Sequence, residues 1–236
     1  MGNSPMVSYT RISPNKTVLR NRKIDTITIH CVVGQCSIET LGTIFARESR
    51  RASSNYGIGP DGRIGMYVEE KDASWCSSSS ANDRRAITIE CASDTTHPYS
   101  INDAVYKSLI DLCVDICKRN CINSLKWKAD KTLIGQTDKQ NLTVHRWFAN
   151  KSCPGDYIYE RLGRIADEVN NRLMQNAPFK VRVRIDDLNY RSLPSIKGEI
   201  LGQTGKGVFT IVEVSDGWGR LKSNAGWINL NFTTKV

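Results

Sequence analysis

One short segment of the sequence concentrates residue types that bind metals and stabilise negative charge. It reads TVHRWFANKSCPG and contains His145, Lys151 and Cys153. A further histidine, His30, ends an apolar run near the N-terminus. Zinc binds imidazole and thiolate, and a catalytic zinc site keeps three protein ligands and one open position. His30, His145 and Cys153 could form such a site, although their spacing alone favours ordinary buried core residues.

Two similar strands are predicted to position part of this chemistry. Residues 26–30 (TITIH) and 86–90 (AITIE) both alternate isoleucine with polar residues. Because successive side chains of a strand point to opposite faces, His30 and Glu90 occupy the same phase at the C-terminal ends of the two strands. We expect them to project to one side if the strands share a sheet. Glu90 could alternatively hold only a backbone amide or an arginine.

Three amphipathic helices are predicted between and after these strands. The first follows Ser37 and continues to about Arg50, the second opens at a capping-box-like Ser100–Asp103, and the third opens near Asp156. Strands interleaved with helices predict an α/β fold with a mixed central sheet flanked by helices. The apolar stripes are Ile38, Leu41, Ile44 and Phe45, then Val105, Leu109, Leu112 and Ile116, then Ile158, Leu162, Ile165, Val169 and Leu173.

The sequence pattern changes near residue 178. Short β-type runs separated by glycines follow, such as KVRVRI, GVFTIVEV and AGWINL. This pattern predicts a small all-β barrel. We therefore expect a catalytic domain over residues 1–177 and a second domain over residues 178–236.

Composition narrows the class of protein. The net charge of +9 favours polyanionic partners such as nucleic acid, acidic lipid or an anionic wall polymer. No run of about 20 apolar residues predicts membrane insertion, and the first residues lack a secretory pattern. The eight cysteines are expected to be mostly reduced and buried. Cys113, Cys117 and Cys121 recur along one helix face, which favours core packing over a metal site.

Several segments, in order, resemble the zinc-dependent N-acetylmuramoyl-L-alanine amidases, the family of phage lysozymes and peptidoglycan recognition proteins. The similar segments are TITIHCV, SSNYGIGPDGRI, DASWC, AITIECA and TVHRWFANKSCPG, which together extend over most of residues 20–160. The resemblance implies that His30, His145 and Cys153 bind Zn²⁺. It also implies that Lys151 is catalytic. A solvated surface lysine is the alternative for Lys151.

The resemblance implies further roles in the cleft. Tyr56 and Glu90 fall on positions linked to acid–base work, and Asn55 and Trp75 on positions expected to contact substrate. Tyr56 and Trp75 could instead be packing aromatics. Cys76 stands where the family often has a cleft histidine, so substrate contacts there are expected to differ.

The C-terminal region resembles the bacterial SH3-like domains attached to wall hydrolases. The similar segments include LNYRSLPS and FTIVEVSDGWGRLK. The resemblance implies wall binding, with core packing as the alternative for both tryptophans. The candidate wall contacts are Tyr190, Arg191, Trp218 and Trp227.

Together these features predict a peptidoglycan amidase that cleaves the bond between the lactyl group of N-acetylmuramic acid and L-alanine. We expect an endolysin or autolysin that remains cytoplasmic until released to the wall. Peptidoglycan is the expected partner, with anionic wall polymers as a further candidate and without nucleic acid binding. The alternatives are a non-catalytic peptidoglycan binder and a zinc endopeptidase that cuts the stem or crossbridge.

Overall fold

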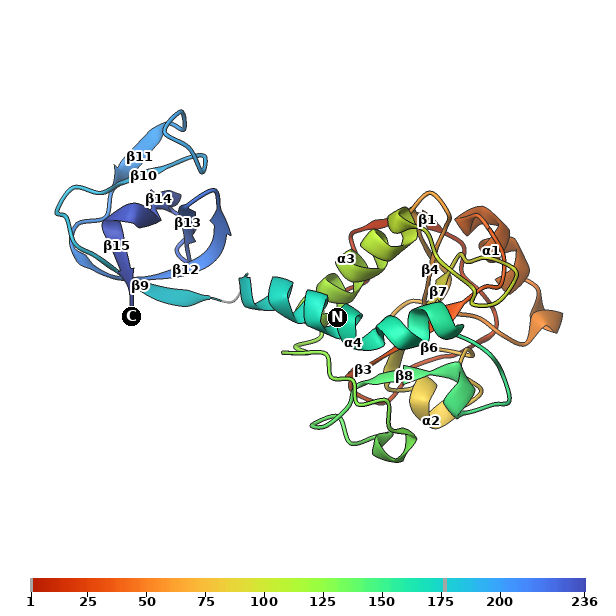
Figure 1. Cartoon of the computed structure of the whole chain (residues 1–236). Coiled ribbons are helices and arrows are strands. Elements are labelled where there is room, and N and C mark those ends of the chain that lie inside the picture. The colour runs from red at the N-terminus through yellow and green to blue at the C-terminus, as the bar shows by residue number, and fades with distance from the viewer. Residues whose placement is uncertain (1, 176–177) are drawn as a thin grey trace. The chain divides into compact units, whose positions relative to one another are not determined.

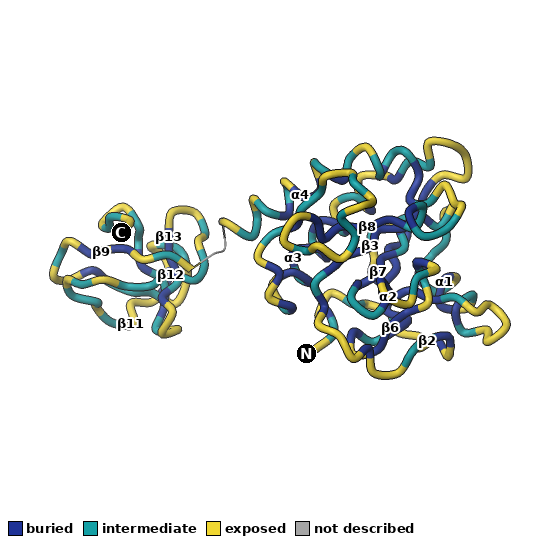
Figure 2. The backbone as a smooth tube through the Cα atoms, turned by 90° about the horizontal axis from the view of Figure 1, so that it is seen from below, coloured by how far each residue is buried: buried dark blue, intermediate teal, exposed yellow. Residues whose placement is uncertain are grey.

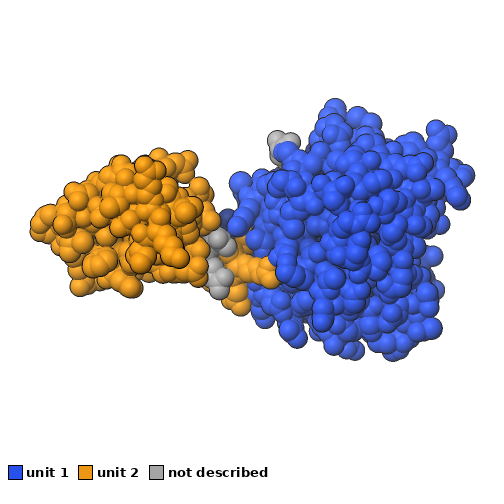
Figure 3. Space-filling model, turned by 90° about the horizontal axis from the view of Figure 1, so that it is seen from above, with its two compact units in different colours: residues 1–170 blue, residues 171–236 orange. Residues whose placement is uncertain are grey.

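The computed structural model describes residues 2–175 and 178–236. It divides into two compact units, residues 1–170 and 171–236 (Figure 3). The helix that begins at Asp156 in the first unit continues past residue 170 to Gln175. The boundary predicted between residues 177 and 178 adjoins residues 176–177, which lie outside the described ones. No helix in the described part of the chain is long and apolar enough to cross a membrane.

The first unit is built on a six-stranded mixed sheet (Figure 1). Its strand order is β1-β5-β4-β7-β3-β8, and all neighbours are parallel except β4 and β5. The predicted α/β fold class is therefore confirmed. The strands are β1 Val7–Thr10, β3 Thr26–Cys31, β4 Tyr56–Ile58, β5 Ile64–Met66, β7 Ala86–Cys91 and β8 Leu142–Val144, with a separate pair β2 Lys16–Thr17 and β6 Ala73–Ser74.

The helices agree with the predicted stripes but not with every boundary. They are α1 Ile38–Phe45, α2 Ser80–Asp83, α3 Asp103–Arg119 and α4 Asp156–Gln175. Helix α1 begins after Ser37 as predicted but ends at Phe45, because the side chains of Ser13 and Asn15 donate to the Phe45 carbonyl. Helix α3 is capped by Asn102 rather than by the predicted Ser100–Asp103 box.

All eight cysteines are free thiols, as expected. Cys113 and Cys117 are buried in the core. The prediction for Cys121 is wrong: α3 ends at Arg119, and Cys121 lies beyond it in the left-handed backbone region with an exposed side chain.

The two faces of the central strands have different chemistry. The isoleucines of β3 and β7 are fully buried, as the dark strands of Figure 2 show. The opposite face carries Thr28, Thr88 and Thr143, which are also buried. The Thr28 and Thr143 hydroxyls lie 2.8 Å apart, and both bond the amide of Asn82 on α2. These bonds satisfy the polar groups that the second face buries.

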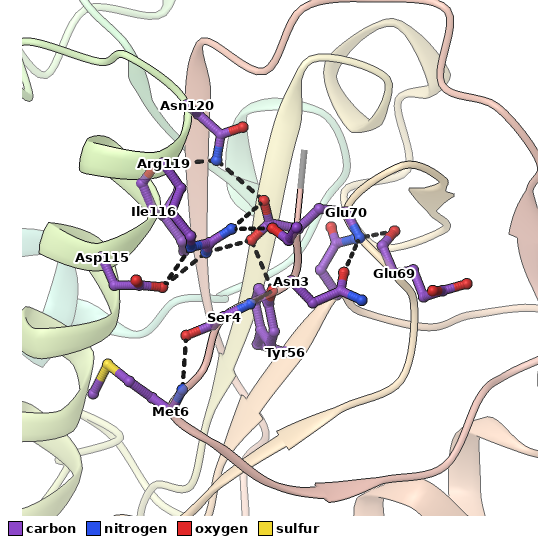
Figure 4. A network of polar contacts seen from close by, with 12 residues as sticks. Asn3, Ser4, Met6, Tyr56, Glu69, Glu70, Asp115, Ile116, Arg119 and Asn120 are labelled. Carbon is purple, nitrogen blue, oxygen red and sulfur yellow. Dashed lines mark hydrogen bonds and ion pairs between the residues drawn. The ribbon is translucent and has the colours of Figure 1, made fainter.

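A buried polar network secures the isoleucine side of the sheet to α3 (Figure 4). The Glu70 carboxylate accepts from Arg119 at 2.6 and 2.8 Å and from the Asn120 amide at 3.1 Å. It also accepts from the Tyr56 hydroxyl at 2.7 Å, and that hydroxyl accepts from the Ser4 amide at 3.0 Å. Removing one partner of a buried ion pair costs a protein about 3–5 kcal/mol of stability. The N-terminal segment is held to this network by the bond from the Ser4 amide to the Tyr56 hydroxyl.

The second unit is a seven-stranded antiparallel sheet with its own core, as the predicted all-β pattern requires. Its order is β11-β10-β14-β13-β12-β9-β15. The strands are β9 Phe179–Val183, β10 Asn189–Arg191, β11 Ile200–Gln203, β12 Gly207–Ser215, β13 Trp218–Leu221, β14 Trp227–Asn229 and β15 Thr233–Lys235.

Candidate active site

The register of β3 and β7 places His30 directly beside Glu90. The two strands are parallel neighbours, and their Cα atoms pair residue by residue, His30 with Glu90 among them. Both side chains therefore lie on the threonine face, as the alternation predicted. The thiol of Cys76, which follows β6, lies 3.7 Å from Glu90 Oε1. Three chemically active groups meet at the carboxyl ends of these strands.

The segment after β8 brings two further groups to the same place. The His145 ring centroid lies 5.1 Å from that of His30, and Cys153 Sγ lies 3.4 Å from His30 Nδ1. A bond from the Arg146 amide to the Cys153 carbonyl closes the loop between them. Gly155 then turns the chain into α4 with a φ of 80°, and a Cβ there would lie 2.7 Å from Tyr99 Cβ. This turn therefore requires glycine.

The protonation states at the site suit metal binding. Burial, with a contribution from His145, lowers the pKa of His30 to about 3. Burial and the nearby Lys151 ammonium lower the pKa of His145 as well. Both imidazoles are therefore neutral near pH 7, which is the form that binds metals. A hydrogen bond with Cys31, and burial, raise the pKa of the Cys153 thiol and so favour its protonated form. A bound divalent cation would reverse this preference and favour the thiolate.

The donor set and its spacing fit a zinc ion. The ligand atoms of His30, His145 and Cys153 all lie within 4.8 Å of one another. The 3.4 Å between His30 and Cys153 is close to the ~3.5 Å that tetrahedral bonds of zinc impose on two ligands. Glu90 Oε2 and His30 Nε2 are buried without a hydrogen-bond partner among the described residues. The site thus forms a possible His–His–Cys metal centre with a carboxylate beside it.

An open cleft of about 450 Å³ leads to this cluster. Lys151 and Trp75 both line it, and the Trp75 indole is 41% exposed while its Nε1 donates to Thr17. The cleft also includes Arg50 and Arg51, which the sequence analysis missed because their positions depend on the end of α1. The lining residues are Thr17, Arg50, Arg51, Ala52, Ala73, Ser74, Trp75, Cys76, Ser78, Ser79, Ser80, Asp83, His145 and Lys151.

Ser78 is a second residue that sequence reasoning missed. Its hydroxyl lies 3.0 Å from His145 Nε2, and its backbone is left-handed with a φ of 63°. The Asp83 carboxylate fixes this turn by accepting from the Cys76 and Ser77 amides at 3.1 Å. A hydrogen bond to one ring nitrogen orients the other toward a metal, so Ser78 sets the direction of the His145 ring. Its position within a run of four serines carries no signal of this contact.

Two predicted site residues lie away from the cleft. Tyr56 pairs with Ile89 across β4 and β7, so its side chain points to the isoleucine face, toward Glu70 and not toward Glu90. Burial and Glu70 raise the pKa of Tyr56, which keeps the phenol protonated. Asn55 is fully buried, and its side chain bonds the Thr88 amide and the Val68 carbonyl. Neither residue is placed to meet a substrate.

The Tyr56→Phe protein should therefore lose stability and keep its activity. The change removes one hydrogen bond from the Ser4 amide and one from the Glu70 carboxylate, which lowers the free energy of unfolding by about 1–3 kcal/mol. Urea denaturation measures the loss, with Tyr106→Phe, which removes only a partly buried bond, as the control. An activity loss above tenfold at unchanged stability would return Tyr56 to the catalytic machinery.

The candidate wall contacts of the second unit differ in exposure. Trp218 is 8% exposed and contributes mainly to packing. Arg191 donates to the carbonyls of Ile196 and Gly198 and so fixes the following loop. Tyr190 and Trp227 are partly exposed.

Comparisons with known proteins agree with this geometry. A family model described as N-acetylmuramoyl-L-alanine amidase matches residues 20–156 and so contains His30, Glu90, His145 and Cys153. No curated protein sequence matches the chain.

Solved structures show the same fold. The Staphylococcus aureus hydrolase AmiA in complex with its ligand has a TM-score of 0.53 and 14% identity, over 70% of this chain and 82% of that chain. A selenomethionine derivative of AmpD has a TM-score of 0.50 and 18% identity, over 70% of this chain and 99% of that chain. PlyL has a TM-score of 0.50 and 15% identity, over 68% of this chain and 95% of that chain. At these identities the likeness concerns the fold, but the family model spans more than half of the chain, and the protein belongs to the N-acetylmuramoyl-L-alanine amidase family.

Proposed function

We propose that the protein is a zinc-dependent hydrolase that cleaves the amide between the lactyl group of N-acetylmuramic acid and L-alanine in peptidoglycan. The observation that carries the proposal is the meeting of His30, His145 and Cys153 beside Glu90 at the cleft that Lys151 lines. In this proposal the two histidines and the cysteine hold the metal. When bound, zinc would acidify a water molecule and polarise the scissile carbonyl.

The chain's own residues supply the proton transfer and charge stabilisation. Burial raises the pKa of Glu90 to about 8 in the metal-free site, and a bound zinc ion would lower it again, so this carboxyl can accept and release a proton near neutral pH. Glu90 takes the proton that the attacking water loses and delivers it to the departing alanine nitrogen. The Lys151 ammonium stabilises the negative charge that develops on the carbonyl oxygen. Trp75, exposed on the cleft wall, offers a flat apolar surface to the substrate.

The identity of the cleaved bond is tested on purified peptidoglycan. Metal-loaded protein should release stem peptides with a free N-terminal L-alanine, and a chelator should stop the release. New amino groups elsewhere in the peptide would identify an endopeptidase instead. Wall binding without any release would identify a non-catalytic binder.

Lys151→Met should lower kcat by about 10²–10³-fold, as loss of one donor to a developing oxyanion does. Because Lys151 is exposed, zinc content and unfolding free energy should stay near those of the wild type. Steady-state kinetics on a soluble muramoyl peptide provide the measurement, and Lys151→Arg should recover part of the rate. A change in KM alone would limit Lys151 to substrate binding.

The second unit is proposed to hold the enzyme on the wall. Tyr190 and Trp227 are partly exposed, and the hairpin of β10 and β11 carries four exposed apolar side chains, Leu193, Ile196, Ile200 and Leu201. Exposed apolar side chains that adjoin one another are typical of a binding site. Sedimentation with purified walls tests the proposal: the Tyr190→Ala, Trp227→Ala protein should remain in the supernatant, and unchanged retention would exclude these rings.

Wall hydrolysis at this bond supports a lytic role. Stem peptides carry the crosslinks between glycan strands, so their release weakens the wall. We propose that the protein lyses bacterial cells in the manner of an endolysin. The fall in turbidity of a cell suspension treated with purified protein tests this role, and walls cleaved without lysis would favour remodelling.

A further inference from the structure

A second hollow, rich in positive charge, adjoins the cleft. Its volume is about 710 Å³, and Ser80 lines both it and the cleft. Four cationic side chains and one carboxylate face it. Its lining residues are Arg22, Lys23, Asp25, Ser80, Ala81, Arg84 and Arg85.

Most of this charge is uncompensated. Asp25 pairs with Arg85 at 2.7 Å, and Arg85 also donates to the Gly135 carbonyl. The four cations therefore exceed the carboxylates by three charges. Arg22 and Lys23 are exposed, and neither makes a hydrogen bond or ion pair to any residue that the structure describes. A concave surface of one sign focuses the field and concentrates ions of the opposite sign.

The backbone that carries these cations is fixed by a buried arginine. Arg20 is 4% exposed, and it lies between Leu19 and Asn21, which both have left-handed φ angles. Burial lowers the pKa of Arg20 to about 10, so the guanidinium stays charged at neutral pH. Its nitrogens donate to five backbone carbonyls, those of Glu70, Asp72, Asp83, Arg84 and Ala86.

These bonds join the two walls of the hollow. The segment before Arg22 is tied to the segment that carries Arg84 and Arg85, so the backbone positions that carry the cations keep their spacing. A site held in its binding shape avoids the ordering cost of association. The backbone frame of the hollow is thus preorganised, and its exposed cations remain available to an anion.

We propose that this hollow binds the phosphate groups of a phosphodiester polymer carried on the same wall glycan as the substrate. Arginine presents a planar fork of donors that matches phosphate oxygens, and lysine adds a point charge. Three uncompensated charges suit several singly charged phosphodiesters better than one small anion. The shared wall at Ser80 would place such a chain beside the bond to be cut.

Binding in this hollow does not depend on zinc or on catalysis. Only the naming of the polymer as a wall component rests on the proposed function. A failed amidase assay would therefore leave the binding result intact, and the reverse also holds.

The test is calorimetric titration of the full chain with a poly(glycerol phosphate) oligomer over a range of salt concentrations. Arg22→Gln, Lys23→Gln should weaken binding at least about tenfold. It should also flatten the slope of log Kd against log salt by about 1.4, since each phosphate contact on a flexible strand contributes about 0.7. Hydrolysis of a soluble muramoyl peptide should not change.

A control variant that removes the same number of charges elsewhere, and other anions offered as ligands, decide whether the binding belongs to this hollow. Lys107→Gln, Lys118→Gln removes two exposed charges from α3 and should weaken binding less than twofold. Equal weakening by both double variants, or no binding by the wild type, would overturn the proposal. Inorganic phosphate that binds as tightly as the oligomer would also overturn it, by indicating a single-anion site. A DNA oligonucleotide of equal phosphate number that binds more tightly would assign the hollow to nucleic acid.

Discussion

Cys153→Ser should remove bound zinc and reduce peptidoglycan hydrolysis by more than about 10³-fold. The thiolate is the one anionic ligand among the three proposed, and a serine hydroxyl is a far poorer ligand for zinc. Loss of an outer partner of a ligand costs about 10–100-fold in metal affinity, and loss of a ligand itself should exceed that. Metal content after dialysis and competition with a chromophoric chelator measure the affinity without reference to activity.

The same substitution at an exposed cysteine provides the control. Cys121→Ser lies beyond the end of α3 and should leave zinc content, activity and stability at the wild-type level. Full zinc occupancy and full activity in Cys153→Ser would show that a different residue completes the site. The cluster of His30, Cys76 and Glu90 would then be the next candidate for metal binding.

Glu90→Gln should lower kcat by about 10²–10⁴-fold while zinc remains bound, because glutamine keeps the shape of the side chain but cannot accept a proton. Steady-state kinetics and metal analysis on the same sample separate the two effects. A kcat within tenfold of the wild type would assign the proton transfer to another group.

Stability of the metal-free protein gives a second readout for Glu90. Its pKa rises from the ordinary 4.5 to about 8 through burial. Below pH 4.5 the carboxyl is neutral in both folded and unfolded chains, so it exerts no penalty. As the pH rises toward 8 the unfolded chain ionises more readily, and the folded state loses stability. Glu90→Gln should remove this decline, so its advantage in urea denaturation should grow between pH 4.5 and 8.

The alternation of side chains along single strands correctly predicted part of this site. The phase of His30 in TITIH and of Glu90 in AITIE determined their common face, and the structure pairs them directly. The matching segments then led to His145, Lys151 and Cys153, which spacing alone could not distinguish from core residues or surface charge. Local sequence is sufficient where one strand and its period decide the outcome.

Other features depend on contacts between segments far apart in the chain. Tyr56 lies in a matching motif, yet the register between β4 and β7 turns it to the face opposite Glu90. The end of α1 is decided by Ser13 and Asn15, about 30 residues earlier. The contact of Ser78 with His145 spans 67 positions. Periodicity carries no information on such pairings, because it describes one element at a time.

The proposed metal ligands come from a sheet strand and from a connecting segment of the chain. His30 belongs to β3, a strand with parallel partners on both sides, whereas His145 and Cys153 belong to the segment between β8 and α4, which bonds β3 through the Cys31 amide and Cys153 Sγ. A ligand stabilises whichever opened forms cannot bind it. A zinc ion bound at this site would therefore link the strand to the segment after β8, and its removal should favour local opening of residues 145–155 while the sheet keeps its protection from hydrogen exchange.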